Sequence, residues 1–441
     1  MNEHVELLSQ LIKNKCVNTG EIDSGNEFKN ADLIETLFSN YSENVQVERL
    51  SKVKNRDNLV VRLEGSDDDA PSLLLLGHSD VVPSGVANWD FDPFGGEVID
   101  GYVCGRGAID MLNLTSSMAL AIKELIDEGF KPKGDLVFAC VADEENGGKL
   151  GAEYLLNEFS DLVNCDYVLT ESGGTQMRYG EEIFLPIVVG EKGVHWVELN
   201  VTGVATHGSK PFGANNALLN TNEIINRFRQ YVSPLSFTKD WDIFLKALGI
   251  ENELAEKLAN KDQHDEAIEQ VEQPLSAVLH SCCHNSISPN MISGGNKINT
   301  VPDQVKLGID IRSLPNINKS DVEKMIEDAL GDIASSVSIN FLQHEESTIS
   351  RIDNVFFDIL GEVSASIIGN SRLLPTVASY ATDARFFRRR GSIAYGFGMF
   401  SDKISYVEHL NMFHSANERV DIESLALTKK MYKMTIKKFL G

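Results

Sequence analysis

Short apolar segments that stop abruptly are the dominant pattern in the first half of the chain. Residues 73–76 form one such segment, and residues 135–142 and 167–170 form two more. Apolar runs of this length predict strands that are buried on both faces of a parallel sheet. Residues 114–128, between the first two runs, have a helical pattern. Because strands and helices alternate up to about residue 192, we expect an α/β domain with a mostly parallel sheet and helices on both faces.

The pattern changes between residues 193 and 311. Residues 194–201 alternate like a strand with one exposed face, residues 217–231 have a helical pattern, and residues 306–311 are again strand-like. The acidic run 251–273 is interpreted as a solvated helix face without a function. We therefore expect an inserted α+β domain, in agreement with a length of 441 residues, which favours two domains over one. The first domain then consists of two parts, residues 1–192 and 312–441. The insertion between them comprises residues 193–311.

Each predicted strand ends in polar residues that could bind a ligand. His78 and Asp80 follow the first strand, the acids 143–145 follow the second, and Glu171 follows the third. The carboxyl ends of parallel strands meet at the edge of the sheet where such folds bind ligands. His78 can bind a metal ion there while Asp80 accepts a hydrogen bond from the other ring nitrogen and orients the ring. The acids 143–145 could instead favour the N-terminus of a helix, but this explains three consecutive acids less well.

Two turns add further candidates: Asp110 in the glycine-rich turn 105–111, and His414 in the polar turn 414–420. The candidate metal ligands are then His78, Asp110, Glu145, Glu171 and His414. Imidazole and carboxylate without thiolate form the ligand set of a hydrolytic rather than a structural zinc site. Five ligands are too many for one catalytic ion, but they suit two ions that share a bridging carboxylate. The sequence therefore predicts a two-metal hydrolase.

The motifs around these residues resemble those of the two-zinc amidohydrolases and peptidases, a family that includes aminoacylase-1, bacterial carboxypeptidase G, acetylornithine deacetylase and succinyl-diaminopimelate desuccinylase. They occur in the family's order and span nearly the whole chain. In one departure, Leu112 and Asn113 stand where many relatives carry Lys and Gly, which we expect to affect substrate choice rather than chemistry. The matching segments are GHSDVVP (77–83), WDFDPFGGEVIDGYVCGRGAIDM (89–111), DEENGG (143–148), TES (170–172), GVATHGSKP (203–211), GGNKINTVPD (294–303), DIRSLP (310–315) and HSANERV (414–420).

The resemblance implies a centre of two divalent metal ions, with zinc preferred and cobalt or manganese as alternatives. Asp110 is expected to bridge the two ions. His78 and Glu171 are expected to complete the coordination of one ion, and Glu145 and His414 are expected to complete that of the other. A one-metal enzyme with the second site unfilled is the alternative.

The same resemblance gives roles to the neighbours of these ligands. Adjacent residues of an extended segment point in opposite directions, so Glu144 is not expected to share a metal ion with Glu145. Glu144 is instead expected to be the general base that takes a proton from a metal-bridged water and gives it to the leaving amine. Asp80 is expected to orient the metal-binding histidine from behind. A cis peptide bond is implied between Asp110 and Met111.

The implied reaction is hydrolysis of an amide bond in a small molecule or short peptide that carries a free carboxylate. Arg312 offers a forked donor for that carboxylate, with Asn299 as its helper and Gly396 in the pocket wall. A structural salt bridge is the alternative role for Arg312. The sequence does not choose between an N-acyl amino acid deacylase, a carboxypeptidase and a dipeptidase. A catalytically silent relative that acts as a binding protein is the alternative function.

The insertion is implied to be a lid through which two copies form a homodimer. His207 lies in this insertion and is not among the expected metal ligands. In relatives, the histidine of this motif reaches into the partner's active site and stabilises the oxyanion that forms when water attacks the carbonyl. An exposed loop histidine is the alternative reading.

Composition and charge exclude several other classes of protein. A net charge of −25 argues against nucleic acid or an anionic membrane as a partner. No apolar run approaches the length of a membrane span. The first residues do not resemble a signal peptide, and the six cysteines are scattered, which favours a reduced cytoplasmic protein over a disulfide framework.

Overall fold

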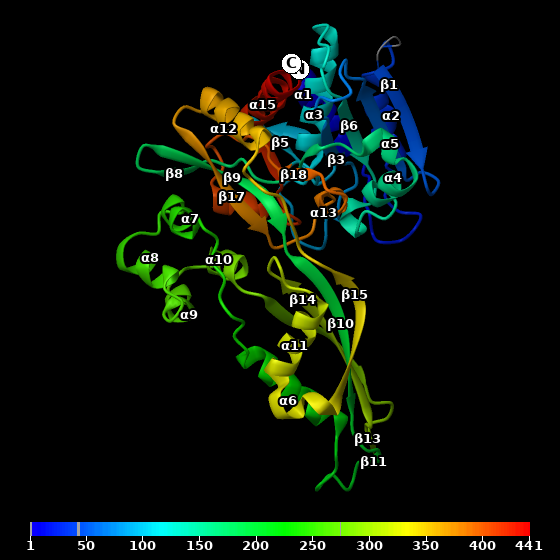
Figure 1. Ribbon diagram of the computed structural model, residues 1–441. Coiled ribbons are helices and arrows are strands. Elements are labelled where there is room, and N and C mark those ends of the chain that lie inside the picture. Colours follow the sequence, from blue (N-terminus) through cyan, green and yellow to red (C-terminus); the bar gives the residue numbers. More distant parts are fainter. Residues whose placement is uncertain (1, 42–44, 274) are drawn as a thin grey trace.

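The computed structural model describes residues 2–41, 45–273 and 275–441. A narrower domain projects from a larger one that contains both termini (Figure 1). The larger domain is built on a mixed sheet of ten strands in the order β1-β2-β6-β3-β7-β18-β9-β16, with β8 and β17 also paired to β9. These strands are β1 (Val45–Ser51), β2 (Asp57–Leu63), β3 (Leu73–His78), β6 (Leu136–Val141), β7 (Tyr167–Thr170), β8 (Met177–Tyr179), β9 (Glu182–Glu191), β16 (Thr348–Ile349), β17 (Ser371–Ala378) and β18 (Ile393–Gly396).

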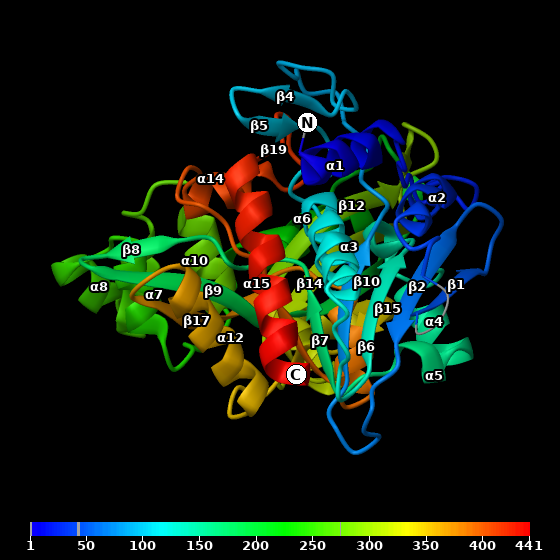
Figure 2. The same ribbon diagram turned by 90° about the horizontal axis from the view of Figure 1, so that it is seen from above.

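The centre of this sheet is parallel, and both of its faces are covered. β3 pairs in parallel with β6 and β7, and β18 pairs in parallel with β7. Leu73 and Leu75 of β3 pack into one apolar core, whereas Leu74 and Leu76 pack into another on the opposite face. The α/β prediction is therefore confirmed. The first core is covered by α1 (Glu3–Lys13), α2 (Phe28–Thr36), α3 (Leu112–Asp127), α12 (Val355–Ile367) and α15 (Ile422–Leu440), and the second by α4 (Ala152–Glu158), α5 (Ser160–Val163) and α13 (Ala384–Arg389). Figure 2 shows α3 and α15 lying across the sheet.

The projecting domain is an antiparallel sheet of four strands in the order β12-β14-β10-β15, with α6 and α11 packed on one face. Its elements are β10 (Gly193–Thr202), α6 (Ala217–Gln230), β12 (Ser286–Gly294), β14 (Gln304–Ser313), α11 (Lys319–Leu330) and β15 (Val337–Glu345). The expected end of the insertion at residue 311 is therefore too early, because β15 pairs with β10 along most of its length. The alternating half-buried residues of β15 belong to the same sheet as the strands before residue 311. A small antiparallel sheet of two strands, β11 (Thr206–His207) and β13 (Thr300–Val301), lies at the far tip (Figure 1).

Four short helices form a separate group, which we call the helical group: α7 (Trp241–Ala247), α8 (Asn252–Ala259), α9 (His264–Ile268) and α10 (Leu275–Cys283). Their core includes Met177, Phe184 and Leu374 of the large sheet. This part of the insertion therefore packs against the larger domain. The acidic run expected to be only a solvated face also buries Leu258 and His264 within α8 and α9.

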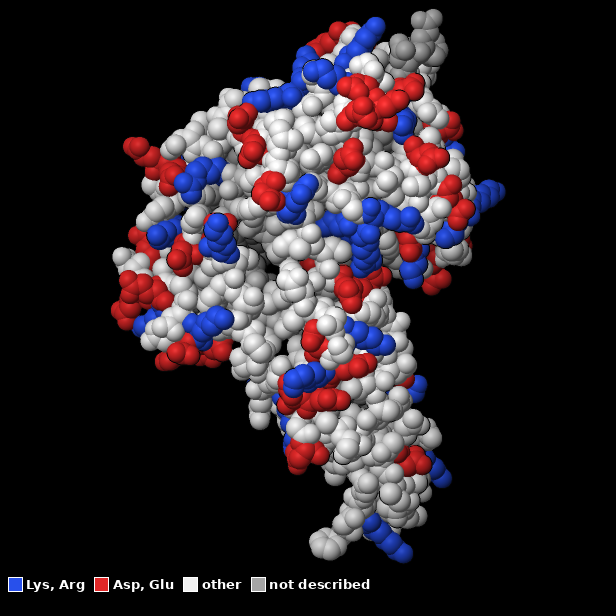
Figure 3. Space-filling model, viewed as in Figure 1, with Lys and Arg blue, Asp and Glu red and all other residues white. Residues whose placement is uncertain are grey.

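The remaining elements lie at the edges of the larger domain. β4 (Glu97–Ile99), β5 (Tyr102–Cys104) and β19 (Arg419–Asp421) form a small sheet, and α14 (Tyr406–Met412) precedes the turn that carries His414. Within the described ranges, no helix is both long and apolar enough to cross a membrane. On the face shown in Figure 3, basic and acidic side chains are interspersed rather than gathered into one basic surface.

Candidate metal centre and pocket

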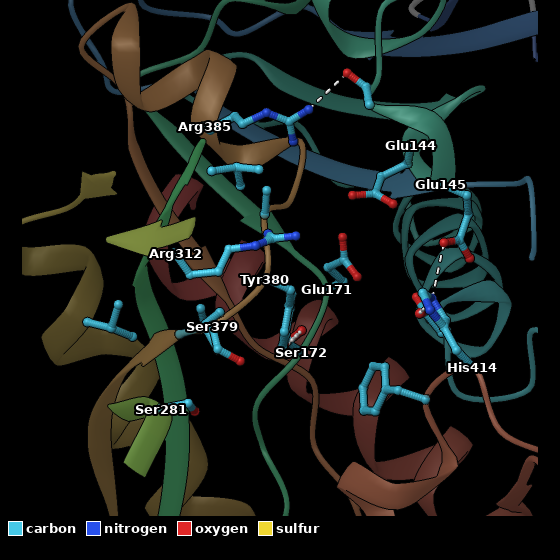
Figure 4. A pocket seen from close by; sticks show the side chains of 18 of the residues that line it. Glu144, Glu145, Glu171, Ser172, Ser281, Arg312, Ser379, Tyr380, Arg385 and His414 are labelled. Carbon is cyan, nitrogen blue, oxygen red and sulfur yellow. Dashed lines mark hydrogen bonds and ion pairs between the residues drawn. The ribbon is translucent and has the colours of Figure 1, made fainter. Parts of the chain in front are cut away.

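The five expected metal ligands come from distant segments and lie together at the carboxyl edge of the sheet. His78 ends β3, Asp110 directly precedes Met111 at the start of α3, and Glu171 follows β7. Glu145 lies in a short 3-10 turn after β6, and His414 follows α14. Figure 4 shows Glu145, Glu171 and His414 around one cavity, which Asp110 also lines and whose volume is about 910 Å³. The chain thus concentrates acids and histidines from five segments at one wall of a single pocket.

Asp110 lies at the centre of this cluster. One of its carboxylate oxygens is 3.2 Å from His78 Nε2, and the other is 3.1 Å from His414 Nε2. His414 Nε2 is also 3.2 Å from Glu145 Oε2. A carboxylate that touches one histidine through each oxygen has the placement that a bridging ligand requires. The peptide bond between Asp110 and Met111 is cis, as expected.

The other side of the cluster holds Glu144 and Glu171. Ligand atoms of His78, Glu144 and Glu171 lie within 4.8 Å of one another, and so do those of His78, Asp110 and Glu145. His78 is therefore shared between two neighbouring groups. Two candidate metal-binding groups therefore lie side by side.

The carboxylates of the cluster favour the binding of a cation. Burial raises the pKa values of Glu144, Glu145 and Glu171. The negative charge of Glu171 adds to the effect at Glu144, and that of Asp110 adds to it at the other two. Hydrogen bonds with Asp110 and Glu145 raise the pKa of His414 to about 10. Carboxylates held this close are stabilised in their ionised form by a cation.

The donor atoms also fit divalent metal ions. Glu145 Oε1 is buried, and among the described residues no hydrogen-bond donor reaches it. The cluster offers imidazole nitrogen and carboxylate oxygen and no sulfur, the set that zinc, cobalt and manganese use in hydrolytic sites. These residues can therefore hold divalent ions.

Asp80 has a wider role than expected. His78 Nδ1 is nearest to the main-chain carbonyl of Asp80, at 3.0 Å, and lies 3.6 Å from its carboxylate. The same carboxylate accepts hydrogen bonds from the backbone N–H groups of Glu144 and Glu145, both at 3.2 Å, and from Asn18 at 2.8 Å. Asp80 therefore fixes the turn that carries the two glutamates as well as the ring of His78.

The first of the three consecutive acids is separated from the other two by its partners. Asp143 pairs with the buried Arg56 at 3.2 Å, and Arg56 also pairs with Glu27 at 2.7 Å. Asp143 has a left-handed backbone with φ 68°, which turns the chain sharply after β6. The turn sends Glu144 and Glu145 toward the pocket, while Asp143 stays in a structural ion pair.

Glu418 holds the loop of Asp110 in place, a role that was not foreseen although the HSANERV motif contains this residue. Its carboxylate accepts a hydrogen bond from Arg106 at 2.8 Å and from the backbone N–H groups of Gly107, Ile109 and Asp110 at 3.0, 2.7 and 2.9 Å. Glu418 is fully buried. The sequence signal that could have pointed to Glu418 is its position four residues after the candidate ligand His414.

The opposite wall of the cavity carries arginines and aromatic rings. Arg312 lines it and donates two hydrogen bonds to Asp310, at 2.8 and 3.0 Å (Figure 4). Arg385 also lines it and donates to the carbonyl of Gly147 at 2.8 Å. The aromatic wall was not foreseen, because its members come from unrelated segments. The aromatic residues of the wall are Trp241, Phe244, Tyr380, Tyr406 and Phe413.

Two expected site residues lie elsewhere in the chain. His207 and Asn299 sit together at the tip of the projecting domain, where the N–H of Gly208 donates to the carbonyl of Asn299 at 2.8 Å. Both residues are exposed. Asn299 is therefore not beside Arg312 within one chain, because it directly precedes β13, which lies at the far end of the projecting domain (Figure 1).

Gly396 was expected in the pocket wall but packs behind it. It ends β18, is buried, and a Cβ atom at this position would lie 2.0 Å from the carbonyl oxygen of Glu171. The glycine therefore allows β18 to approach the backbone that carries Glu171. Its role is to support the site, not to contact a substrate.

Comparisons with known proteins agree with this geometry. The family model described as peptidase family M20/M25/M40 matches residues 74–438. An uncharacterized metallohydrolase of Methanococcus maripaludis is 27% identical over 464 residues, which cover 98% of both chains. A probable succinyl-diaminopimelate desuccinylase of Staphylococcus aureus is 25% identical over 388 residues, or 87% of both chains. The crystal structure of an M20 family metallo-carboxypeptidase from Sulfolobus solfataricus has a TM-score of 0.72 at 17% identity and covers 100% of this chain and 99% of its own.

We expect Gly396→Ala to disturb the site from behind. The added methyl group clashes with the backbone of Glu171, so the variant should lose about 1–3 kcal/mol of unfolding free energy and should bind less metal. Gly369→Ala is the matched control, because no atom lies within 4 Å of the Cβ position there. Chemical denaturation and elemental analysis measure both effects. Unchanged stability and metal content in Gly396→Ala would contradict the supporting role.

Proposed function

The chain belongs to peptidase family M20/M25/M40, and we propose that it hydrolyses an amide bond in small substrates that carry a free carboxylate. Membership makes it a metal-dependent enzyme that acts on amide or peptide bonds. The observation that carries the proposal is a pocket with an acid–histidine cluster centred on Asp110 on one wall and Arg312 on the other. N-acyl amino acids and short peptides are the substrate class. A silent binding protein is disfavoured because Glu144 and all five candidate metal ligands are present in the sequence.

In this proposal the site binds two metal ions, and zinc suits the donor set best. The residues that would hold them are Asp110, shared by both ions, with His78 and Glu171 for one ion and Glu145 and His414 for the other. When bound, such ions polarise the substrate carbonyl and lower the pKa of a water molecule toward about 7. A pair of ions also balances the negative charge of the four carboxylates.

Glu144 is the general base. Its carboxylate is largely buried, lines the cavity and lies 4.0 Å from His78 Nε2. Its backbone is fixed by Asp80, so the carboxylate is held at one position above the metal centre. There it takes a proton from the attacking water and passes it to the nitrogen of the leaving amine.

The far wall selects the substrate. Arg312 keeps its guanidinium at the cavity surface while Asp310 fixes its orientation. A planar, oriented guanidinium binds a carboxylate through two parallel hydrogen bonds. A volume of about 910 Å³ is large enough for a dipeptide or an N-acyl amino acid, and the aromatic rings favour an apolar side chain or acyl group.

The tip of the projecting domain completes the site of a second subunit in this proposal. His207 and Asn299 lie far from the cavity of their own chain, and both are exposed, at or beside the paired strands β11 and β13. A homodimer that brings this tip to the partner's cavity supplies a donor for the oxyanion. We expect the enzyme to work in the cytoplasm.

The test of the substrate class is a matched pair: an N-acyl amino acid and its carboxamide, assayed with added zinc, cobalt or manganese. The free acid should be preferred, and Arg312→Gln should lower kcat/KM for it by about 10–100-fold with little effect on the carboxamide, because a charge-assisted hydrogen bond is lost. Arg178→Gln, an exposed arginine on β8, is the control. An unchanged preference in Arg312→Gln would remove this residue from carboxylate recognition.

Glu144→Gln should lower kcat by about 10²–10⁴-fold, the usual contribution of a general base, while the metal content stays the same. Glu145→Ala should lose metal as well as activity, because it removes a ligand. Rate measurements and elemental analysis on the same samples separate the two. Metal loss in Glu144→Gln together with full metal in Glu145→Ala would mean that the two roles are reversed.

Mixing two inactive variants tests the shared site. His207→Ala should lose on the order of 10²-fold in turnover with its metals and dimer intact, since one oxyanion donor is worth about 3 kcal/mol. A mixed dimer of His207→Ala and Glu144→Ala chains has one intact site and should regain part of the activity. If subunits exchange but no activity returns, or if the active species is a monomer, His207 does not act across a dimer.

A further inference from the structure

The helical group closes one end of the catalytic cavity and forms an apolar chamber beside Arg312. Figure 4 shows the labelled glutamates on one side of the cavity and Arg312 and Ser281 on the other. Arg312 of β14 pairs with Ser286 of β12, and Ser286 follows the end of α10 by three residues. The last turn of α10 therefore lies next to the arginine that is expected to bind the substrate carboxylate.

Strand β9 forms a floor that runs from the helical group to the metal centre. Phe184 packs in the core of the helical group, whereas Leu185 packs in the main core on the other face of the sheet. Because side chains alternate along a strand, Pro186 and Val188 share the face of Phe184, and both line the cavity. Val188 pairs with Gly396, which packs behind the metal centre. The chamber is therefore continuous with the catalytic site.

The other walls come from three helices, each of which turns one side toward the cavity. The lining residues within each helix are three or four positions apart, a spacing that places them on the same side. They include Trp241 and Phe244 of α7, Val278 and Ser281 of α10, and Tyr406 and Leu410 of α14.

This chamber offers little to a charged or polar group. Between residues 238 and 282, none of the described residues that line the cavity carries a charge. The indole N–H of Trp241 donates to the carbonyl of Leu258 at 3.1 Å, and the hydroxyl of Ser281 donates to the carbonyl of Val278 at 3.0 Å. Because a buried polar group without a partner is unfavourable, the chamber suits an apolar group.

We propose that the chamber binds a large apolar side chain on the carboxylate-bearing residue of the substrate, and that α7 and α10 set this preference. The assignment rests on the proposed function, in which Arg312 binds the carboxylate and the scissile amide lies at the acid–histidine cluster. The side chain branches from the carbon that joins the amide nitrogen to the carboxylate, so it lies beside Arg312, where the chamber opens. The acyl group lies beyond the carbonyl, away from Arg312, and does not contact the helical group.

Two series of substrates separate the two ends of the molecule. N-acetyl amino acids vary the side chain with a fixed acyl group, and N-acyl glycines vary the acyl group without a side chain. We expect kcat/KM for N-acetyl-phenylalanine to exceed the values for N-acetyl-alanine and N-acetyl-glutamate by about 10²-fold or more. A single methylene in an apolar pocket is already worth about 10–200-fold, and a charged side chain would lose its hydration there.

Val278→Phe fills the chamber and should lower the ratio of kcat/KM for N-acetyl-phenylalanine to that for N-acetyl-alanine by about tenfold or more. The order of preference among N-acyl glycines should stay the same. Ala277→Phe is the matched control, because it adds a ring at an exposed neighbouring position of α10 that does not line the cavity. Ser281→Leu, on the cavity side of α10, replaces Val278→Phe if thermal unfolding shows that the latter does not fold. An unchanged ratio, or a changed order among the acyl groups, would overturn the proposal.

Binding without turnover separates the chamber from the proposed reaction. The probe 3-phenylpropionate carries a carboxylate and an apolar ring but no scissile bond. Calorimetry on the metal-loaded wild-type protein and on Ala277→Phe should show tighter binding of 3-phenylpropionate than of propionate, and Val278→Phe should lose this preference. The same pattern without hydrolysis of either substrate series would refute the proposed function and retain the chamber. Equal binding of the two acids by the wild-type protein would refute the chamber itself.

Discussion

The main constraint on the site is the mutual repulsion of the carboxylates that converge on Asp110, which the rest of the structure must counteract. Parallel strands end at one edge of the sheet, so the acids that follow β6 and β7 are brought close together in a buried position. Burial and like charges both disfavour ionisation, and cations beside the carboxylates offset both effects. The acid–histidine cluster is therefore a device for concentrating positive charge next to a substrate carbonyl.

Several buried hydrogen bonds hold the acids against this repulsion. Glu418 fixes the loop of Asp110 through three backbone N–H groups, and Asp80 fixes the turn of Glu144 and Glu145 through two. Arg56 neutralises the neighbouring Asp143. Each contact ties a short loop to a residue far away in the sequence. The positions of the ligands are thus set by the rigid sheet and its loops and do not depend on the ions alone.

The sheet and the metal-binding segments could be predicted from the sequence because their signals are local. A continuous apolar run predicts a buried strand, and a polar residue at its end must lie at the edge of the sheet. The end of the insertion and the aromatic wall could not be predicted in this way. Strand β15 is half-buried and pairs with a strand more than 130 residues earlier, and Trp241 and Tyr406 meet only through tertiary packing. Gly396 was misplaced for the same reason, and the separation of Asn299 from Arg312 within one chain was not foreseen: a motif gives the identity of a residue but not the direction in which its segment runs.

The helical group gives the pocket a wall that the large sheet does not provide. It rests on apolar residues of β8, β9 and β17, and two of its helices, α7 and α10, reach the cavity. Its position relative to the sheet therefore influences which acyl group or side chain fits beside the metal centre. The chemistry and the selection of substrate are built on separate parts of the chain.

The most direct measurement of the central claim is anomalous X-ray diffraction from crystals of the zinc-loaded protein. If Asp110 bridges a pair of ions, data at the zinc edge will show two peaks about 3.5–4 Å apart in the cavity, one on each side of its carboxylate. A single peak, or a pair of peaks that does not flank Asp110, would contradict this account.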